Sequence, residues 1–277
     1  MIKIRNNEVI AEITVKGASL ESITVDGKSI LWNKDATWWN RVAPFLFPIV
    51  GRLLDNEYSV DGKTYPLSQH GFLRDSDFSV EDQTETACTL KFMSNDKTRE
   101  VYPFDFEVII AYTLLGRNLL IDATIVNAGE TDMYYSFGYH PAFIVESKDA
   151  YIELQGPKPF KQYTFDGPYC NGETEFDGYR VDFDMMTYEN MTLVFEEVHR
   201  VILHDGKRKL AMDVRSYPHL GIWTPTLEDG TQAPFVCLEP WAGFGDRIDH
   251  DKILNHKFGI EKIEPQSQKN WSTTIEV

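Results

Sequence analysis

The stretch RVILHDGKRKLAMDV, residues 200–214, has the pattern of a β-hairpin. Two runs rich in aliphatic and β-branched residues, 200–204 and 209–214, flank the dipeptide Asp205-Gly206. An Asp-Gly pair accepts the positive φ angles of a tight hairpin turn, and such turns match the twist of the flanking strands. The stretch therefore predicts two antiparallel strands joined by a short turn.

The same turn signal recurs along the chain. Asp-Gly pairs occur at 26–27, 61–62, 166–167, 177–178 and 229–230, with an Asn-Gly pair at 171–172, and several of them lie between β-type runs. Other runs rich in β-branched and aromatic residues span 106–112, 120–126 and 271–277. No window of helical length has apolar residues at i, i+3, i+4 and i+7. The sequence predicts an all-β fold, a large antiparallel β-sandwich, with helix content far below the usual roughly one third.

The chain is expected to form a single domain, residues 1–277. Large β-sandwiches often reach this length as one domain, and no internal repeat or shift in composition indicates a boundary. Residues 147–189, which are rich in Gly and Pro, are predicted to be the part with the most loops.

Composition restricts the partners. The chain has 27 Lys and Arg against 43 Asp and Glu, a formal net charge of −16, which disfavours nucleic acids and anionic membranes but not an uncharged sugar. No run approaches the roughly 20 apolar residues of a membrane span, and the N-terminus has no signal-peptide pattern. Cys88, Cys170 and Cys237 form no disulfide or Cys-x-x-Cys pattern, so a cytoplasmic protein is predicted. A monomer or a homodimer is expected.

Four segments place polar, titratable residues among aromatic residues, Gly and Pro. They are FPIVGRL (47–53), QHGFLRD (69–75), FGYHPAF (137–143) and VCLEPWAG (236–243). Pro141 restricts His140 to an extended backbone, and Glu239 closes an apolar run where a charge is costly unless it is paired or used. Pro240 predicts that this strand ends there or lies at an edge of the sheet. Together the segments supply an acid, a base and hydrogen-bond donors.

Each of these residues also has a simpler structural interpretation. His70 beside Gly71 can be a turn residue, His140 can serve packing, and Arg52 can neutralise a neighbouring carboxylate. A metal site is a competing interpretation, because two His and one carboxylate can bind iron. The His-x-His spacing common in small metal-binding β-barrels is absent, so neither a metal nor another cofactor is expected. No serine elbow, phosphate loop or dinucleotide fingerprint occurs.

In their order and separation, QHGF, GYHPAF and CLEPW resemble the signature segments of the galactose-mutarotase-like (aldose 1-epimerase) superfamily. The combination of FPxxGR and QHGF resembles its LacX-type branch. The resemblance implies the galactose mutarotase-like supersandwich and a cofactor-free isomerase of carbohydrate metabolism. Such an enzyme interconverts the α and β anomers of an aldohexose.

The resemblance also implies roles for single residues. It makes His140 the general acid, Glu239 the general base, and His70 and Arg52 substrate-binding residues. Arg74 fits a His-Gly-Phe-x-Arg pattern of relatives that act on hexose 6-phosphates. Residues 197–200 replace the strand in which typical members carry an Asp that binds sugar hydroxyls, so that contact and the choice of sugar stay open.

Aromatic side chains suit the apolar face of a sugar. Trp223 is the chosen candidate for this role, and the others are Trp38, Trp39, Phe72 and Trp241. Three alternatives to a free-sugar mutarotase remain. They are a hexose-6-phosphate mutarotase, a carbohydrate-binding β-sandwich without catalysis, and a metal-dependent β-barrel enzyme.

Overall fold

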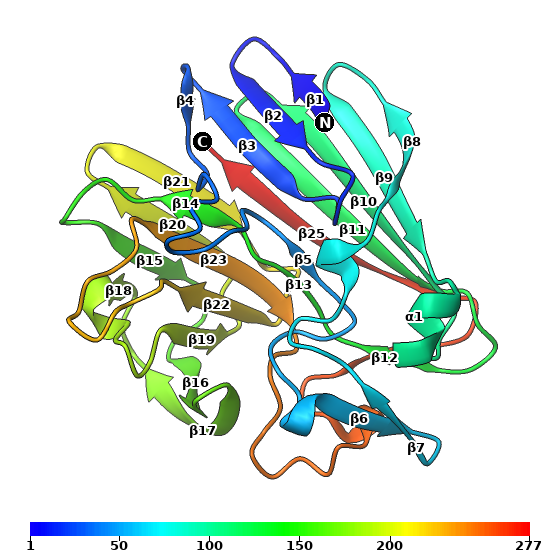
Figure 1. Cartoon of the computed structure of the whole chain (residues 1–277). Helices are drawn as coiled ribbons and strands as arrows, with labels where there is room; N and C mark the ends of the chain where they lie inside the picture. Colours follow the sequence, from blue (N-terminus) through cyan, green and yellow to red (C-terminus); the bar gives the residue numbers. More distant parts are fainter.

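The computed structural model describes all 277 residues and consists mainly of antiparallel strands (Figure 1). Its one α-helix, α1 (Asp96–Val101), has six residues, and the other helical segments are three-residue 3-10 turns. The all-β prediction is therefore confirmed. No helix has both the length and the apolar character needed to cross a bilayer. The three cysteines are buried and free.

The larger of the two main sheets has nine strands, and one of its faces covers the core. In β10 and β11 buried and half-exposed residues alternate, as expected for strands with one face against the core. In sheet order the strands are β18 (Arg180–Asp182), β15 (Tyr151–Gln155), β20 (Arg200–Asp205), β21 (Arg208–Asp213), β25 (Gln268–Glu276), β11 (Asn118–Asn127), β10 (Phe106–Leu115), β9 (Ala87–Met93) and β8 (Ser79–Gln83).

The second main sheet carries the segments singled out in the sequence. Its central strand β23 is buried along its whole length, as expected for a strand covered on both faces. In order the strands are β17 (Tyr169–Phe176), β16 (Phe160–Asp166), β19 (Thr192–Glu196), β22 (His219–Trp223), β23 (Phe235–Ala242), β13 (Phe137–Tyr139) and β5 (Phe45–Leu46), and β14 (Ala142–Ile144) also pairs with β23.

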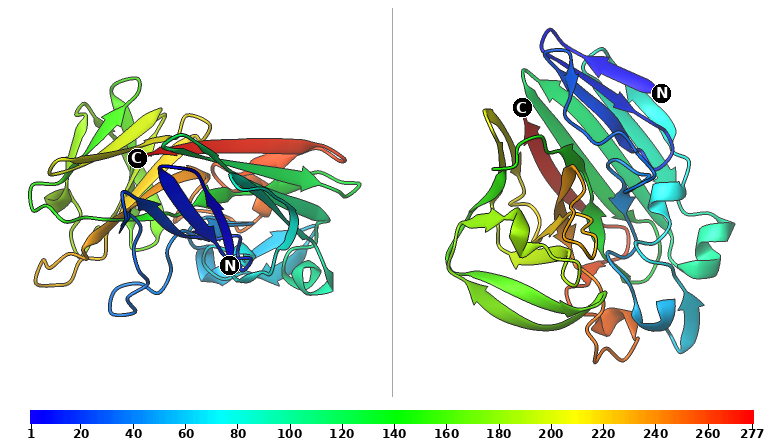
Figure 2. Two further views of the ribbon diagram at one scale, coloured as in Figure 1. Left: turned by 90° about the horizontal axis from the view of Figure 1, so that it is seen from above. Right: turned by 60° about the vertical axis from the view of Figure 1, so that its left-hand side comes forward.

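Three smaller sheets complete the fold. A four-stranded sheet of β1 (Ile2–Arg5), β2 (Val9–Ile13), β3 (Leu20–Val25) and β4 (Lys28–Ser29) lies over the nine-stranded sheet (Figures 1 and 2). Two pairs, β6 (Glu57–Val60) with β7 (Lys63–Pro66) and β12 (Met133–Tyr135) with β24 (Glu261–Ile263), lie at the opposite end. One apolar cluster of 63 buried residues includes side chains from the four-stranded sheet and from both main sheets. Its continuity supports the proposal of a single domain.

The predicted turns are only partly of the expected type. Both residues of Asp26-Gly27 and of Asp61-Gly62 have positive φ, as a type I′ turn requires. Gly206 and Gly167 have positive φ but their Asp partners do not, although both pairs join hairpins. The Asn-Gly pair at 171–172 lies inside β17, so its prediction as a turn was wrong.

The expectation of a loop-rich segment at 147–189 was also wrong, because this segment contains β15, β16, β17 and β18. Its Gly and Pro residues are concentrated in the connection between β15 and β16 and at the tip of the β16–β17 hairpin. Gly and Pro therefore mark the ends of these strands.

Candidate active site

His140 lies opposite Glu239 because the neighbouring strand is broken there. β13 ends at Tyr139 and β14 begins at Ala142, and both pair with β23. The pairs Gly138–Trp241 and Ala142–Cys237 on either side place His140 across from Glu239 in the same register.

Pro240 does not end its strand, which contradicts the prediction. β23 continues to Ala242 and lies in the interior of its sheet, between β22 on one side and β13 and β14 on the other. The Leu238 N–H donates to the Pro141 carbonyl. In the same register Pro240 lies opposite Tyr139, the last residue of β13, so the proline falls directly beside the break in the partner strand, where the ladder is interrupted.

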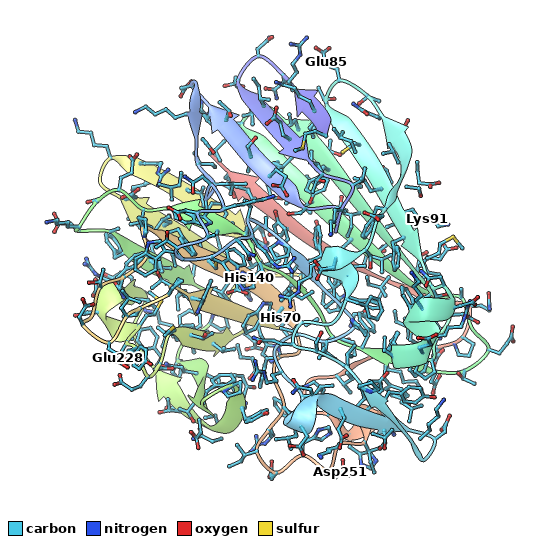
Figure 3. The ribbon with its side chains drawn as sticks, in the orientation of Figure 1. His70, Glu85, Lys91, His140, Glu228 and Asp251 are labelled. Atoms are coloured by element: carbon cyan, nitrogen blue, oxygen red, sulfur yellow. The ribbon has the colours of Figure 1, made fainter.

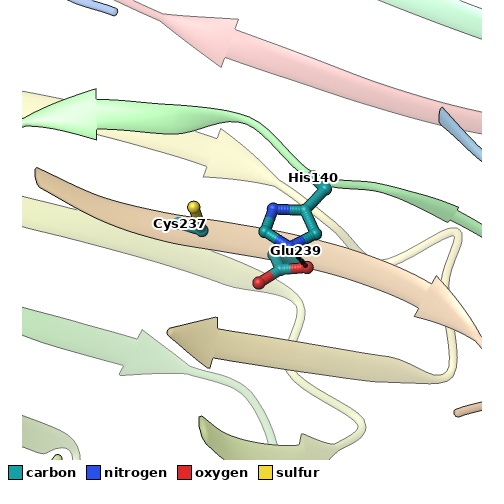
Figure 4. A group of neighbouring side chains, drawn as sticks. All are labelled: His140, Cys237 and Glu239. Atoms are coloured by element: carbon teal, nitrogen blue, oxygen red, sulfur yellow. Dashed lines mark ion pairs between the residues drawn. The ribbon is translucent and has the colours of Figure 1, made fainter. Parts of the chain in front are cut away.

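The two side chains form a buried acid–base pair. His140 Nε2 lies 3.0 Å from Glu239 Oε2, and the side chains are only 9% and 1% exposed (Figure 4). Burial lowers the pKa of His140 and raises the pKa of Glu239, both well away from their ordinary values, because each charged form loses its hydration. Their environment thus favours the uncharged form of both groups.

His70 enters the same site from a turn with positive φ (66°). The Gly51 N–H donates to His70 Nδ1 at 3.1 Å, so the neutral ring carries its proton on Nε2. Burial, with the charges of nearby arginines, lowers the pKa of His70 to about 3. The His70 ring is 5.8 Å from that of His140, and both lie in the centre of the molecule (Figure 3). His70 is therefore neutral, and its donor nitrogen Nε2 lies 3.3 Å from the Gln69 side-chain nitrogen.

Gln69 holds the two predicted arginines. Arg52 Nη2 donates to the Gln69 side-chain oxygen at 3.1 Å, and Arg74 Nη2 donates to the Gln69 main-chain carbonyl at 2.9 Å. The Nε atoms of both arginines are buried without a hydrogen-bond partner. A third arginine, Arg41, is neutralised by Asp75 through two contacts of 3.1 and 3.2 Å.

Aromatic rings enclose His140. Trp39 stacks on its imidazole with ring centroids 4.8 Å apart, and Trp223 meets it edge-on at 5.6 Å. The indole N–H of Trp32 donates to the Trp39 carbonyl at 2.8 Å and so holds the Trp39 segment. Phe72 packs instead against Phe47 and other core aromatics, so it is not available to a sugar.

One cavity of about 510 Å³ is lined by all six predicted site residues, Arg52, His70, Arg74, His140, Trp223 and Glu239. This volume is in the range of small-molecule sites. Neither Glu197 nor His199 lines it, which leaves the position of the family's hydroxyl-binding Asp without a counterpart there. Sequence reasoning missed further lining residues from the β16–β17 hairpin, from the loop before β19 and from the start of β19, namely Phe165, Gly167, Pro168, Tyr188, Glu189, Asn190, Met191 and Thr192.

The cavity wall contains buried polar atoms without hydrogen-bond partners. A buried polar group in this state costs about 1–3 kcal/mol, so a concentration of them points to a polar ligand. They are Arg52 Nε, Arg74 Nε, His140 Nδ1 and Trp241 Nε1.

A metal ion fits this site less well than a polar organic ligand does. The potential ligand atoms of His140, Cys237 and Glu239 lie within 4.8 Å of one another (Figure 4). Cys237 packs in an apolar cluster with Trp32, Ala142, Ala233 and Phe235, and burial raises the pKa of its thiol well above the ordinary value. Metals bind the thiolate, which this environment disfavours.

Comparison with known proteins agrees with the fold and with the family that the motifs resemble. The family model described as aldose 1-epimerase matches residues 1–252. The chain is 27% identical over 302 residues to Protein LacX (plasmid) of Lactococcus lactis subsp. lactis, covering 99% of each.

Two solved structures are similar over their whole length. The galactose mutarotase related enzyme from Lactobacillus acidophilus has a TM-score of 0.93 at 29% identity, covering 99% of this chain and 96% of that one. A galactose mutarotase-like protein from Lactobacillus casei also has a TM-score of 0.93, at 28% identity, covering 100% and 99%. The chain therefore belongs to the aldose 1-epimerase family of isomerases, in its LacX-type branch.

Proposed function

We propose that this enzyme interconverts the α and β anomers of an aldohexose, with His140 as general acid and Glu239 as general base. The observation that carries the proposal is the buried contact of 3.0 Å between the two side chains in the wall of the cavity. Mutarotation needs one group that gives a proton and one that takes a proton at the same carbon. β23 holds Glu239, and the short break between β13 and β14, both paired with β23, holds His140.

The proposed reaction transfers one proton in each direction. Glu239 takes the proton of the anomeric hydroxyl, the bond between C1 and the ring oxygen breaks, and His140 gives its proton to that oxygen. The product is the open-chain aldehyde. Rotation about the C1–C2 bond and reversal of the same transfers then form the other anomer.

The pair holds one proton in both halves of this cycle. Before ring opening the proton is on His140 and Glu239 is a carboxylate, and after ring opening Glu239 is protonated and His140 is neutral. Burial favours the second arrangement, since it disfavours both charged forms. The site is thus adapted to the half of the cycle in which the sugar is open.

The other residues of the cavity are proposed to bind and orient the sugar. His70 offers a neutral N–H, and Arg52 and Arg74 offer guanidinium N–H groups toward ring hydroxyls. Trp223 and Trp39 provide flat apolar surfaces for the C–H face of a pyranose.

A hexose 6-phosphate is a second candidate substrate, favoured by one observation. Arg52, Arg74 and Arg41 all lie close enough to lower the pKa of His70, in a chain whose net charge is −16. Arg41 is hydrogen-bonded to Asp75, and Arg74 Nε lies 3.9 Å from the same carboxylate without a hydrogen bond to it. Arg52 forms no ion pair, and its Nε has no hydrogen-bond partner. Guanidinium groups bind phosphate through paired hydrogen bonds.

The test is the rate at which freshly dissolved α-galactose, α-glucose and their 6-phosphates reach anomeric equilibrium, followed by polarimetry or NMR. The proposal predicts a rate proportional to enzyme concentration for at least one of these sugars. A protein that binds a sugar without changing this rate would be a carbohydrate-binding module, and the proposal would be wrong.

A further inference from the structure

Behind the cavity lies a second buried ionic cluster, which the proposed chemistry does not use. Asp246 follows β23 in the chain and is 1% exposed, and Lys257 is 3% exposed. His250 lies in a polar stretch of the sequence, yet its side chain is only 6% exposed. Three charged or titratable side chains buried together are costly unless they hold something in place.

The contacts of this cluster converge on the Asp246 carboxylate. Lys257 Nζ lies 3.0 Å from Oδ1 and also donates to the Phe244 carbonyl at 2.6 Å. On the other oxygen, Oδ2 accepts the Leu54 N–H at 2.8 Å and lies 3.1 Å from His250 Nδ1. The carboxylate therefore has partners on both oxygens.

The same residue holds the segment that carries Arg52. The Asp246 N–H donates to the Arg52 carbonyl at 2.9 Å, so main chain and side chain of Asp246 grip the turn at Arg52 and at Leu54. The adjacent glycines bring the two segments into contact, since a Cβ on Gly51 would lie 2.5 Å from the Gly245 nitrogen. Any shift of Asp246 moves this turn.

The turn of residues 51–54 also determines which ring nitrogen of His70 carries the proton. The main-chain N–H of Gly51 donates to His70 Nδ1, and the main-chain N–H of His70 donates to the Gly51 carbonyl at 2.8 Å. The first of these bonds leaves the proton of neutral His70 on Nε2. Asp246 is thus hydrogen-bonded to Arg52 and Leu54, and the backbone of the same turn continues to Gly51, which is hydrogen-bonded to the His70 imidazole.

We propose that Asp246 is a positioning residue for substrate binding: it fixes the turn of residues 51–54 so that Arg52 and the Nε2–H of His70 face the sugar. The inference rests on the proposed function, because it assigns Arg52 and His70 to the sugar. It predicts that loss of the carboxylate weakens sugar binding more than it slows the proton transfers at His140 and Glu239.

The chain contains a matched control. Asp205 is also a buried carboxylate, 5% exposed, which accepts the N–H groups of Glu146 and Ser147 and pairs with Arg208. It does not line the cavity. Asp246→Asn and Asp205→Asn therefore remove similar charges from similar settings, and only the first should affect the sugar.

The experiment compares both variants with the wild type in steady-state mutarotation. For Asp246→Asn we expect KM to rise on the order of 10-fold with kcat changed by less than about 3-fold, since displacements far from the chemistry act through geometry. Asp205→Asn should lower thermal stability and leave KM unchanged. Equal effects of both variants on KM, or none from Asp246→Asn, would overturn the proposal.

A second readout does not depend on turnover. In ¹⁵N NMR spectra of the wild type, His70 should show an unprotonated Nδ1 and a protonated Nε2, and in Asp246→Asn a mixture of the two tautomers. An unchanged His70 spectrum in Asp246→Asn would contradict the inference. A wild type inactive on every sugar, with the predicted NMR change, would instead contradict only the proposed function.

If Asp246→Asn fails to fold, His250→Gln carries the same test. It keeps the Lys257 and Leu54 contacts of the carboxylate and removes only one of its partners. We expect a smaller rise in KM, about 3-fold, and a partial change of the His70 tautomer. Wild-type values for both would overturn the proposal.

Discussion

The molecule has two buried clusters of ionisable side chains, one around Asp246 and one around Glu239, and they differ in how their polar atoms are satisfied. Both oxygens of the Asp246 carboxylate and the Lys257 ammonium have hydrogen-bond partners, and His250 Nδ1, which has no hydrogen bond, lies 3.1 Å from Oδ2. In the other cluster Glu239 Oε2 lies 3.0 Å from His140 Nε2, and His140 Nδ1 has no hydrogen-bond partner. The Asp246 carboxylate is thus held by a lysine and a main-chain N–H, whereas the Glu239 carboxylate contacts the proposed acid itself, and this second pair is the less complete of the two.

This difference distinguishes buried ionisable groups that stabilise the fold from those that act on a ligand. A buried group whose contacts are complete stabilises the backbone to which it binds. A buried group left incomplete costs stability, and a fold retains it where a ligand completes it. The pKa directions agree, since the pKa of Asp246 stays below its ordinary value despite burial, through His250 and Lys257, whereas burial raises that of Glu239.

The largest effect is expected from the incomplete pair. Glu239→Gln and His140→Asn should each lower kcat by roughly 10²–10⁴, the usual contribution of a positioned proton-transfer group. The double variant should be only slightly worse than either single one, because the two groups act as a unit. Steady-state kinetics of the three variants provide the measurement. If the loss of kcat in the double variant equalled the two single losses multiplied together, the two residues would act independently, and the pair would not be a unit.

A smaller effect is expected from Arg74. Hydrogen bonds to charged groups contribute about 1.5–3 kcal/mol, so Arg74→Ala should lower kcat/KM for galactose 6-phosphate by roughly 10- to 150-fold, and for galactose by less. Arg41→Ala is the control, because Asp75 already neutralises that guanidinium. Equal losses on both sugars would remove the phosphate role of Arg74.

Trp39 should have an effect of a few fold. Its stacking on His140 holds the ring toward Glu239, and an aromatic pair contributes about 0.5–1.5 kcal/mol, so Trp39→Leu should lower kcat by roughly 2- to 12-fold. Trp38→Leu removes the neighbouring indole, which does not line the cavity. The measurement is kcat of both variants, and similar losses would indicate a general effect on the loop.

Cys237 should matter least. It is near His140 and Glu239 but packs in an apolar cluster, so Cys237→Ala should change kcat by less than about 2-fold and cost ~1 kcal/mol of stability. Kinetics and thermal unfolding measure the two quantities. A loss of activity comparable with that of Glu239→Gln, together with bound metal in the purified wild type, would favour the metal-dependent alternative.

Much of the fold could be predicted because its signals are local. Asp-Gly turns between β-branched runs define hairpins such as β20–β21, and the four motif segments supplied five of the six predicted cavity residues, all except Trp223. The sequence failed where long-range pairing decides the outcome. Pro240 lies in an interior strand beside the break that its partner strand has at His140, about a hundred residues earlier in the chain, and no local pattern reveals that break.

Burial of charge was equally out of reach of local reasoning. His250 and Lys257 stand among polar neighbours in the sequence, and only the tertiary contact with Asp246 explains their burial. The cavity residues of the loop before β19 carry no motif, and they line the site because β19 and β22 bring that loop beside β23. These features depend on which strands become neighbours, which periodicity does not reveal.

The pH dependence of kcat/KM tests the central claim, that one proton shared by a buried histidine and a buried glutamate carries the reaction. Activity requires the pair to hold one proton. A second proton adds to His140, whose pKa is lowered by burial, so the acid limb should lie below the ordinary histidine pKa of 6.5. The pair loses its proton at Glu239, whose pKa burial raises well above the ordinary 4.5, so activity should persist above that pH and fall as the pH rises through the raised pKa.

With the uncatalysed rate subtracted at each pH, the wild type should give this broad bell, and the residual activity of Glu239→Gln should lack its basic limb. An acid limb at or above pH 6.5, or a basic limb unchanged by Glu239→Gln, would contradict the account.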